Sequence, residues 1–179
     1  VSLDTYKSSV AKAGLEAGTD LINDIWGLKY DEKMAAVIAE YDVACCLMHN
    51  REQADYQDFG ADWIRDLEQS VELARQAGIR DEKIILDPGV GFAKTYEQNL
   101  TAIRKLSELN RLGYPVLLGT SRKSVIGLTL VVPAEERVTG TAVTTVFGVI
   151  SRYSFVRVHD VKENVQAIRM ARAILMGGE

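Results

Sequence analysis

The sequence has few cysteines and prolines, two and three respectively among 179 residues, and no long uninterrupted apolar run. A disulfide scaffold and a membrane-spanning helix, which needs about 20 apolar residues, are therefore not expected. The net charge of −4 provides no basic field, which argues against nucleic acid as a partner. Cys45 and Cys46 are adjacent, so they point to opposite faces of a strand and are expected to be reduced core residues. Reduced cysteines are typical of a cytoplasmic protein.

Several catalytic motifs are absent as well. The turn after the first apolar run, residues 4–7, contains no glycine, so the fingerprint of a dinucleotide-binding fold is missing. The sequence also has no Walker A motif, no Gly-x-Ser-x-Gly elbow and no cluster of ligands with zinc-site spacing. These absences remove the commonest nucleotide-binding and hydrolytic classes.

Short apolar runs alternate with stretches of helical periodicity. Apolar runs without strict alternation are typical of strands buried on both faces of a parallel sheet. The predicted strands are 1–4, 20–25, 43–49, 83–87, 115–119 and 154–159. Apolar positions that share a helix face are Met34, Val37, Ile38 and Tyr41, then Trp63, Leu67, Val71 and Ala74, then Leu100, Ile103, Leu106 and Leu109, and finally Val161, Val165, Ile168 and Leu175. Gly18, Gly78 and Gly113 stand where a glycine ends a helix.

Two architectures fit a chain of six strand–helix units: an open doubly wound sheet and a (β/α) barrel. A barrel builds its active site from polar groups at the carboxyl ends of its strands. All six predicted strands end in or beside polar or ionisable residues, which helix capping alone does not easily produce. We therefore favour an α/β fold of the TIM-type (β/α) barrel class, with residues 1–179 as a single domain whose start at Val1, already inside a predicted strand, suggests that it is N-terminally incomplete.

The segment 85–95, Ile-Leu-Asp-Pro-Gly-Val-Gly-Phe-Ala-Lys-Thr, is the most specific in the chain. Asp87 ends a strand, Pro88 and Gly89 then form a tight turn, and Gly91 allows the backbone to approach a ligand closely. A carboxylate there can accept two hydrogen bonds from a ring with adjacent N–H donors, such as an amino-pyrimidinone. The alternative is an ordinary turn aspartate.

Two further segments carry cations beside hydroxyls or histidine. Arg122 and Lys123, in Gly-Thr-Ser-Arg-Lys-Ser (119–124), suit an anion or a π-rich ring, or else form a solvated basic turn. Arg157 and His159 fall on one strand face and suit a phosphate or pyrophosphate. The alternative for Arg157 is a structural pair with Asp160.

The segments 2–5, 22–25, 86–95, 121–127 and 157–161 resemble, in order and spacing, the motifs of the dihydropteroate synthase family of pterin-binding enzymes. The resemblance implies a (β/α)8 barrel of which this chain supplies strands three to eight. It implies a transferase that condenses 6-hydroxymethyl-7,8-dihydropterin pyrophosphate with p-aminobenzoate, yielding 7,8-dihydropteroate and pyrophosphate in folate biosynthesis. A homodimer and a Mg²⁺ cofactor are implied too, and we expect the metal ligand to lie outside this chain.

The same resemblance implies roles for individual residues. Residues expected to hold the pterin are Asp4, Asn23, Ile25, Met48, Asp87 and Lys123. Phe92, Ser121 and Arg122 are expected at the site for p-aminobenzoate and sulfonamides, and Arg157 and His159 at the pyrophosphate site. Lys123, Arg157 and His159 are the expected catalytic residues.

Two departures from the family pattern bear on these expectations. Ala93 stands where many members carry glycine, which predicts a stiffer turn. The loops that follow the family's first two strands have no counterpart here, so the resemblance implies that the first two strand–helix units are missing, and we expect the 179-residue chain alone to be inactive or impaired. Two alternatives stay open: a non-catalytic truncated pterin-binding domain, and a pterin-binding methyltransferase of the methyltetrahydrofolate:corrinoid type, which has no use for the Ser-Arg-Lys run.

Overall fold

The computed structural model describes residues 1–177, and strands alternate with helices as predicted, except that two α-helices and not one separate the last two strands. The strands are β1 (Ser2–Asp4), β2 (Leu21–Asp24), β3 (Ala44–Met48), β4 (Ile84–Asp87), β5 (Leu117–Leu118) and β6 (Phe155–Val156). The helices are α1 (Ser8–Glu16), α2 (Met34–Glu40), α3 (Phe59–Gln76), α4 (Tyr96–Arg104), α5 (Ser124–Leu130), α6 (Val138–Ile150) and α7 (Val161–Met176), with short 3-10 turns η1 (Asp81–Lys83), η2 (Leu106–Leu112) and η3 (Ala134–Glu136).

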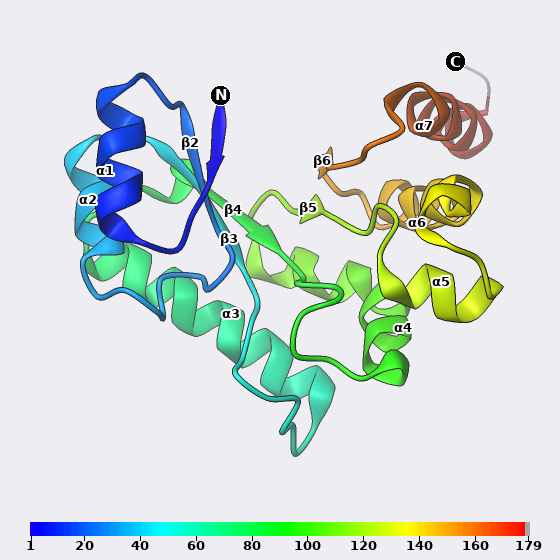
Figure 1. Cartoon of the computed structure of the whole chain (residues 1–179), viewed down its shortest axis with the longest axis horizontal. Coiled ribbons are helices and arrows are strands. Elements are labelled where there is room, and N and C mark those ends of the chain that lie inside the picture. Colours follow the sequence, from blue (N-terminus) through cyan, green and yellow to red (C-terminus); the bar gives the residue numbers. More distant parts are fainter. Residues whose placement is uncertain (178–179) are drawn as a thin grey trace.

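All strand pairs are parallel, and their order in space follows their order in the chain. One sheet runs β1-β2-β3-β4, and β5 pairs with β6 in a second sheet. A single parallel bridge between Leu86 and Val116 links β4 to the segment leading into β5. Sequential parallel strands with intervening helices are the arrangement of a (β/α) barrel, and the barrel prediction is confirmed as a partial one (Figure 1).

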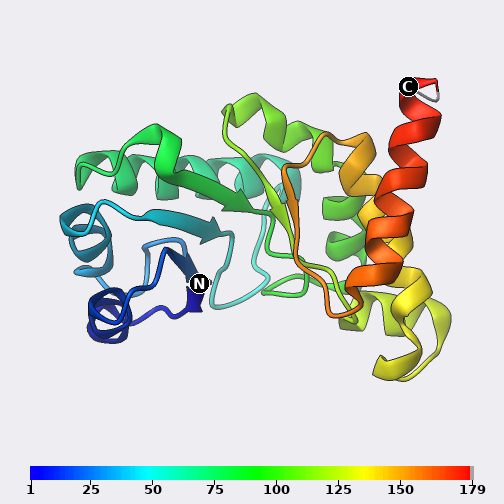
Figure 2. The same ribbon diagram turned by 90° about the horizontal axis from the view of Figure 1, so that it is seen from above.

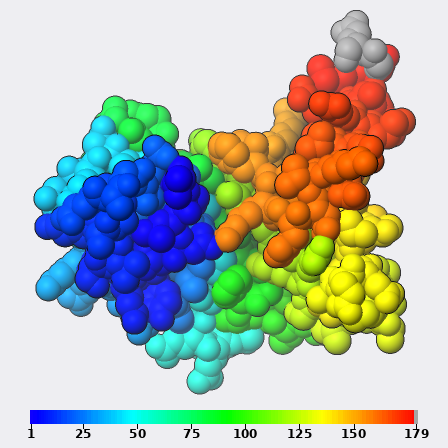
Figure 3. All heavy atoms as spheres, turned by 45° about the horizontal axis from the view of Figure 1, so that its top comes forward, coloured from blue at the N-terminus to red at the C-terminus, as the bar shows by residue number. Residues whose placement is uncertain are grey.

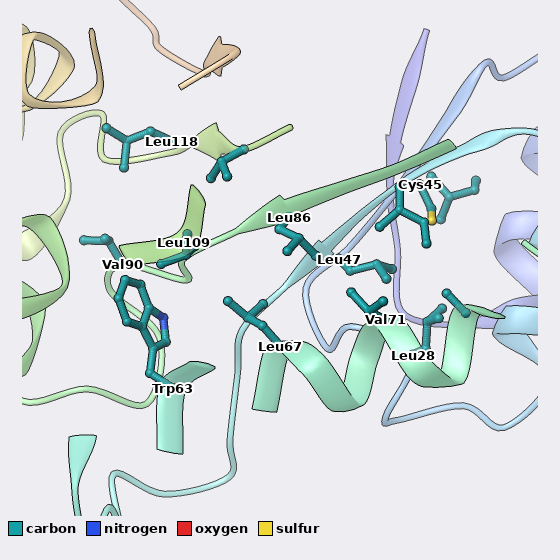
Figure 4. Close-up of a cluster of buried hydrophobic side chains, with 14 of the residues drawn as sticks. Leu28, Cys45, Leu47, Trp63, Leu67, Val71, Leu86, Val90, Leu109 and Leu118 are labelled. Atoms are coloured by element: carbon teal, nitrogen blue, oxygen red, sulfur yellow. The ribbon is translucent and has the colours of Figure 1, made fainter. Parts of the chain in front are cut away.

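The main core lies between the sheet and the helices outside it. Figures 1 and 2 show α1, α2 and α3 along the β1–β4 sheet, and α5, α6 and α7 beside β5 and β6. In Figure 4, Leu67 and Val71 of α3 face Leu47 of β3 and Leu86 of β4, and all four side chains are buried. Burying each side chain of this size contributes about 1.5–3 kcal/mol, so α3 is a principal stabiliser of the sheet.

Helix starts follow local capping rules. Asp58 is the N-cap of α3, and its side chain accepts a hydrogen bond from the Ala61 amide at 3.0 Å. Thr95 and Gln98 form a reciprocal capping box at the start of α4. Gly18, Gly78 and Gly113 all have positive φ, which confirms their predicted place after helices.

The structure shortens two predicted strands and exposes one predicted helix face. β5 and β6 contain two residues each, so Arg157 and His159 lie in the loop after β6 and not within a strand. α7 is present, but Val161, Val165 and Leu175 are exposed. Its buried positions are Asn164 and Ala171, because α7 packs on α6 through the hydrogen bond that Thr145 donates to Asn164 at 2.7 Å.

None of the helices within residues 1–177 combines the length and apolar character needed to cross a membrane.

Candidate active site

A cavity of about 340 Å³ opens at the carboxyl ends of the strands. It collects side chains that are far apart in sequence because parallel strands end at a common edge. Its lining comprises Asp4, Asn23, Ile25, Met48, Asp87, Phe92, Gly119, Ser121, Lys123, Arg157, Val158 and His159. Of the residues predicted for the site, the structure brings all but Arg122 to this cavity.

Asp4, Asn23 and Arg157 form one polar cluster on the cavity wall. Asp4 and Asn23 are in register on β1 and β2, and the Asn23 side-chain amide donates to Asp4 Oδ1 at 3.0 Å. Arg157 donates to Asp4 Oδ2 at 2.5 Å, so the loop after β6 reaches the end of β1, as the neighbouring blue and orange segments in Figure 3 illustrate. Asn23 Oδ1 is buried and has no hydrogen-bond partner among residues 1–177. A ligand N–H group entering the cavity would satisfy this acceptor.

Asp87 is buried at the end of β4, in register with Met48 of β3. One carboxylate oxygen accepts a hydrogen bond from the Gly89 amide at 2.7 Å. Burial raises the pKa of Asp87, while the charges of Lys123, Lys94 and Arg157 and the Gly89 hydrogen bond oppose that rise. The turn needs glycine at position 89, because φ is +67° and a Cβ atom would lie 1.9 Å from the His49 carbonyl oxygen.

Lys123 bridges Phe92 and the turn after Asp87. Its ammonium donates to the Val90 carbonyl and lies 4.6 Å from the centroid of the Phe92 ring. Gly91 makes room for the lysine, since a Cβ atom there would come within 2.9 Å of Lys123 Cδ. Burial lowers the pKa of Lys123, and the Asp87 carboxylate opposes this. An aromatic face and a cation thus share one side of the cavity.

Ser121 and Arg122 are neighbours in sequence but turn in different directions. The His159 amide donates to Ser121 Oγ at 3.1 Å, and His159 Nδ1 lies 2.8 Å from the same oxygen. Arg122 has φ of +57°, and its guanidinium donates to the Asp160 carboxylate at 3.0 and 2.6 Å. Asp160 therefore pairs with Arg122 and not with Arg157, and Arg122 holds the loop after β6 beside the one after β5.

The turn after Asp87 also contains the predicted stiff position. Ala93 has φ of +41°, in the region that glycine adopts readily and alanine rarely. The hydroxyl of Tyr56 donates to the Ala93 carbonyl at 2.8 Å, which helps to hold this conformation.

The sequence marks His49 as a residue either at the pocket wall or simply hydrogen-bonded, and the structure gives the second outcome, in a cluster behind the turn that the sequence did not predict. His49, at the end of β3, is fully buried and contacts Lys94 and Asp66 instead of lining the cavity. Asp66 and Arg51 complete a cluster of charges there. No regular spacing connects these positions, and only Lys94 belongs to a recognisable motif.

Within residues 1–177 no group of three His, Cys, Asp or Glu side chains is arranged to hold a metal ion. Cys45 and Cys46 are both free and buried, and burial raises the pKa of the Cys45 thiol to about 12. Such a thiol stays protonated near neutral pH and is a poor nucleophile.

A partial parallel barrel with polar groups gathered at its carboxyl rim defines the class of (β/α) barrel proteins that bind small molecules at that rim. Residues 1–159 match the family model described as "Pterin binding enzyme". The chain belongs to this pterin-binding family and, within it, to the dihydropteroate synthase group.

Similar proteins agree with this assignment. The dihydropteroate synthase of Clostridium beijerinckii is 55% identical over 98% of this chain and 65% of its own length. The dihydropteroate synthase of Bacillus subtilis is 50% identical over 99% of this chain and 62% of its own. The chain thus spans less than two thirds of these curated relatives.

Solved structures of dihydropteroate synthases have the same fold. The Clostridium difficile protein, crystallised in the presence of pteroic acid, superimposes with a TM-score of 0.94 at 49% identity, covering 97% of this chain and 66% of that one. The Thermus thermophilus protein in complex with 6HMPPP gives a TM-score of 0.91 at 40% identity, covering 97% and 70%.

Proposed function

We propose that this protein is a dihydropteroate synthase, a transferase that joins 6-hydroxymethyl-7,8-dihydropterin pyrophosphate to p-aminobenzoate in folate biosynthesis. The observation that carries the proposal is a pair of buried acceptors on residues that line one cavity: Asn23 Oδ1, which has no hydrogen-bond partner among residues 1–177, and the Asp87 carboxylate. Relatives at 50–55% identity are named dihydropteroate synthase, and solved relatives are described in complex with pteroic acid or with 6HMPPP.

The acceptor pair suits the amino-pyrimidinone end of a pterin. That edge presents adjacent N–H donors, which a carboxylate can accept together. Asn23 Oδ1 then accepts a further N–H from the same bicyclic ring, while Asp4 fixes the asparagine through its amide nitrogen. Ile25 and Met48 provide apolar walls for the ring faces. These contacts would hold the pterin with its exocyclic methylene toward the open side of the cavity.

The transfer breaks the bond between the methylene carbon and the pyrophosphate oxygen. The bonding electron pair leaves with the pyrophosphate. The amine of p-aminobenzoate then donates its electron pair to the cation-like carbon and loses a proton. The carboxylates of Asp4 and Asp87 favour the transient positive charge on the pterin. Phe92 and Lys123 would border the arylamine. Ser121 lines the cavity as well and would lie on the same side.

Arg157 and His159 would receive the pyrophosphate, because both reach the cavity from the loop after β6. Arg157 is half exposed and is paired with Asp4, and an exposed pair of this kind contributes only about 0–1 kcal/mol. The arginine can therefore exchange Asp4 for a phosphate at little cost. Mg²⁺ is part of the proposal as a charge partner of the pyrophosphate, but the described residues offer no three-residue cluster for it, so no step is derived through the metal.

Calorimetric titration of the purified 179-residue chain with pteroic acid and with 6-hydroxymethylpterin tests the pterin site. We expect both to bind, and Asp87→Asn to weaken both by about 10- to 100-fold, the cost of one to two charge-assisted hydrogen bonds. The matched control is Asp42→Asn, a surface carboxylate that is exposed and paired with Arg80. Unchanged affinity of Asp87→Asn would contradict the proposed orientation.

Pyrophosphate release in the presence of p-aminobenzoate separates the functional alternatives. A transferase consumes both substrates in equal amounts, and Arg157→Gln should slow turnover by at least tenfold. Pterin binding without turnover is the result expected both of a non-catalytic pterin-binding domain and of a synthase lacking its first two strand–helix units, and turnover after those units are supplied distinguishes the synthase. Binding of methyltetrahydrofolate in preference to the pyrophosphate ester would favour the methyltransferase alternative.

We also propose a cytoplasmic homodimer. A second cavity of about 390 Å³, lined almost entirely by apolar atoms, lies between α4, α5 and α6, and its lining includes the exposed side chains Leu130, Val143 and Phe147. Contiguous exposed apolar surface marks an interaction site, and most oligomers are symmetric pairs of one chain. Sedimentation velocity should give a dimer for the wild type and a monomer for Phe147→Asp, and a wild-type monomer at all concentrations would refute this.

A further inference from the structure

The turn that carries Phe92 has one backbone hydrogen bond of its own, from the Phe92 amide to the Gly89 carbonyl at 3.1 Å, and side chains from other segments supply further contacts. Trp63 donates to the Pro88 carbonyl at 3.0 Å. The Gly91 amide donates to Asn99 Oδ1 at 2.6 Å, and the same asparagine donates to the Lys94 carbonyl at 3.2 Å. Tertiary contacts therefore add to the single backbone bond in fixing this turn, which belongs to no helix or strand.

Lys94 makes the contacts that span the turn. Its side chain folds back so that Nζ donates to the Gly89 carbonyl at 2.9 Å and to the Phe92 carbonyl at 3.0 Å. The third contact of Nζ is with His49 Nδ1 at 2.8 Å. The two carbonyls flank Val90 and Gly91, so one nitrogen joins both ends of the turn.

Behind Lys94 lies a chain of polar side chains that stays clear of the cavity. His49 is fully buried, and its Nε2 is 3.0 Å from Asp66 Oδ2. Arg51 donates to both oxygens of Asp66, at 2.6 and 3.2 Å. The connected groups thus run from Arg51 through Asp66 and His49 to Lys94, and none of the four is among the cavity-lining residues.

The turn in question shapes one wall of the cavity. Phe92 lines it directly, and Lys123 rests against the Phe92 ring while donating to the Val90 carbonyl. A shift of the 89–92 backbone would therefore displace both the ring and the lysine. Side chains that do not touch the substrate can in this way fix the residues that do, and such support positions a substrate to within fractions of an ångström.

We propose that Lys94 is a positioning residue, anchored through His49, Asp66 and Arg51, that clamps residues 89–92 so that Phe92 and Lys123 meet the arylamine half of the substrate. The identity of that ligand rests on the proposed function, whereas the clamp itself does not. Lys94 acts through the turn and touches no reacting atom.

The protonation of the cluster agrees with this arrangement. Burial lowers the pKa of His49 to about 4, so the ring is neutral near pH 7 and can accept from Lys94 at Nδ1 while donating from Nε2 to Asp66. Burial also lowers the pKa of Lys94, to about 7. The two carbonyls and His49 Nδ1 together accept the three N–H groups of the protonated ammonium, so the clamp is complete when Lys94 is charged.

Lys94→Met removes the clamp while keeping a chain of similar length, and two measurements on the 179-residue chain test it. Amide exchange by NMR should become at least tenfold faster at Gly89, Gly91 and Phe92 but stay unchanged in β3. Calorimetry should show pteroic acid, which carries the arylamine, binding at least fivefold more weakly, and 6-hydroxymethylpterin changing less than twofold. Lys12→Met, the same substitution at an exposed lysine of α1, is the matched control and should alter neither.

A merely structural role for Lys94 predicts equal weakening of both ligands, and that result would overturn the proposal. Unchanged exchange in the turn would overturn it as well. If the wild-type chain binds no pterin, the proposed function fails, while the exchange measurement still decides on the clamp because it needs no ligand. Should Lys94→Met not fold, Asp66→Asn weakens the anchor at a partly exposed position and should give the same pattern with smaller amplitude.

Discussion

Acid should destabilise this protein mainly through His49. The side chain has no exposed area, and burial lowers its pKa from 6.5 to about 4, with the charges of Lys94 and Lys29 acting in the same direction and Asp66 opposing. In the unfolded chain the imidazole returns to its ordinary pKa near 6.5. Between pH 6.5 and 4 the unfolded state therefore binds a proton that the folded state does not, and the free energy of unfolding falls as the pH falls.

The size of the effect follows from the two pKa values. The interval from 6.5 to about 4 corresponds to about 3 kcal/mol, at roughly 1.4 kcal/mol per pH unit. A domain of this size has a total stability of about 5–15 kcal/mol, so the loss is a large fraction. The contribution of Asp66, whose pKa is lowered by hydrogen bonds from His49 and Arg51, is lost only below its unfolded pKa near 3.8 and does not overlap.

Urea denaturation followed by far-ultraviolet circular dichroism between pH 7 and 4 measures this. His49→Gln retains an acceptor for Lys94 and a donor for Asp66 but cannot titrate, so it should lose about 3 kcal/mol less than the wild type over that range. His159→Gln, at the exposed second histidine, should follow the wild type. If His49→Gln and the wild type lose the same amount, the buried neutral histidine is not the source of acid sensitivity.

Three further predictions concern other positions. Gly91→Ala should lower the free energy of unfolding by about 1–3 kcal/mol in urea titrations, because φ is +87° and the new methyl would meet Lys123; an unaffected midpoint would show that the turn can adjust. Because the pKa of Lys94 is lowered to about 7, the unfolded state binds the extra proton above that pH, so stability should rise more steeply from pH 7 to 9 in the wild type than in Lys94→Met, and equal slopes would refute this. Asp58→Ala should cost about 1 kcal/mol by removing the cap of α3, and equal thermal midpoints would refute it.

The sequence predicted the order and type of the elements well. Apolar runs located all six strands. β2, β3 and β4 are buried as such runs predict, whereas β1 and β6 have exposed residues because little covers them. The same runs overstated β5 and β6, because the length of a strand is set by the neighbour it pairs with, and β5 and β6 pair over only two residues. The exposed apolar face of α7 could not be foreseen for a related reason: periodicity identifies a face, and only packing decides whether that face is covered.

The candidate site was predictable where topology alone gathers residues. Asp4, Asn23 and Asp87 end parallel strands, so their convergence follows from the fold. Arg122 was predicted to lie at the cavity with Ser121, because a motif does not reveal the backbone angle φ. Its positive φ instead directs the side chain toward Asp160 and away from the cavity. The His49–Asp66 pair joins the end of β3 to the middle of α3, 17 residues later in the chain. No periodic pattern in the sequence connects these two positions, so the pair could not be predicted.

The pair between Asp4 and Arg157 joins residues 153 positions apart. Closing a flexible loop of that length costs about 4 kcal/mol in chain entropy, more than the 0–1 kcal/mol that a half-exposed ion pair returns. The contact therefore forms only after the intervening strands and helices have already brought its partners together. In refolding, formation of this ion pair therefore marks the last step. A spectroscopic label at either residue should report a phase that follows the appearance of helical structure and coincides with the assembly of the cavity.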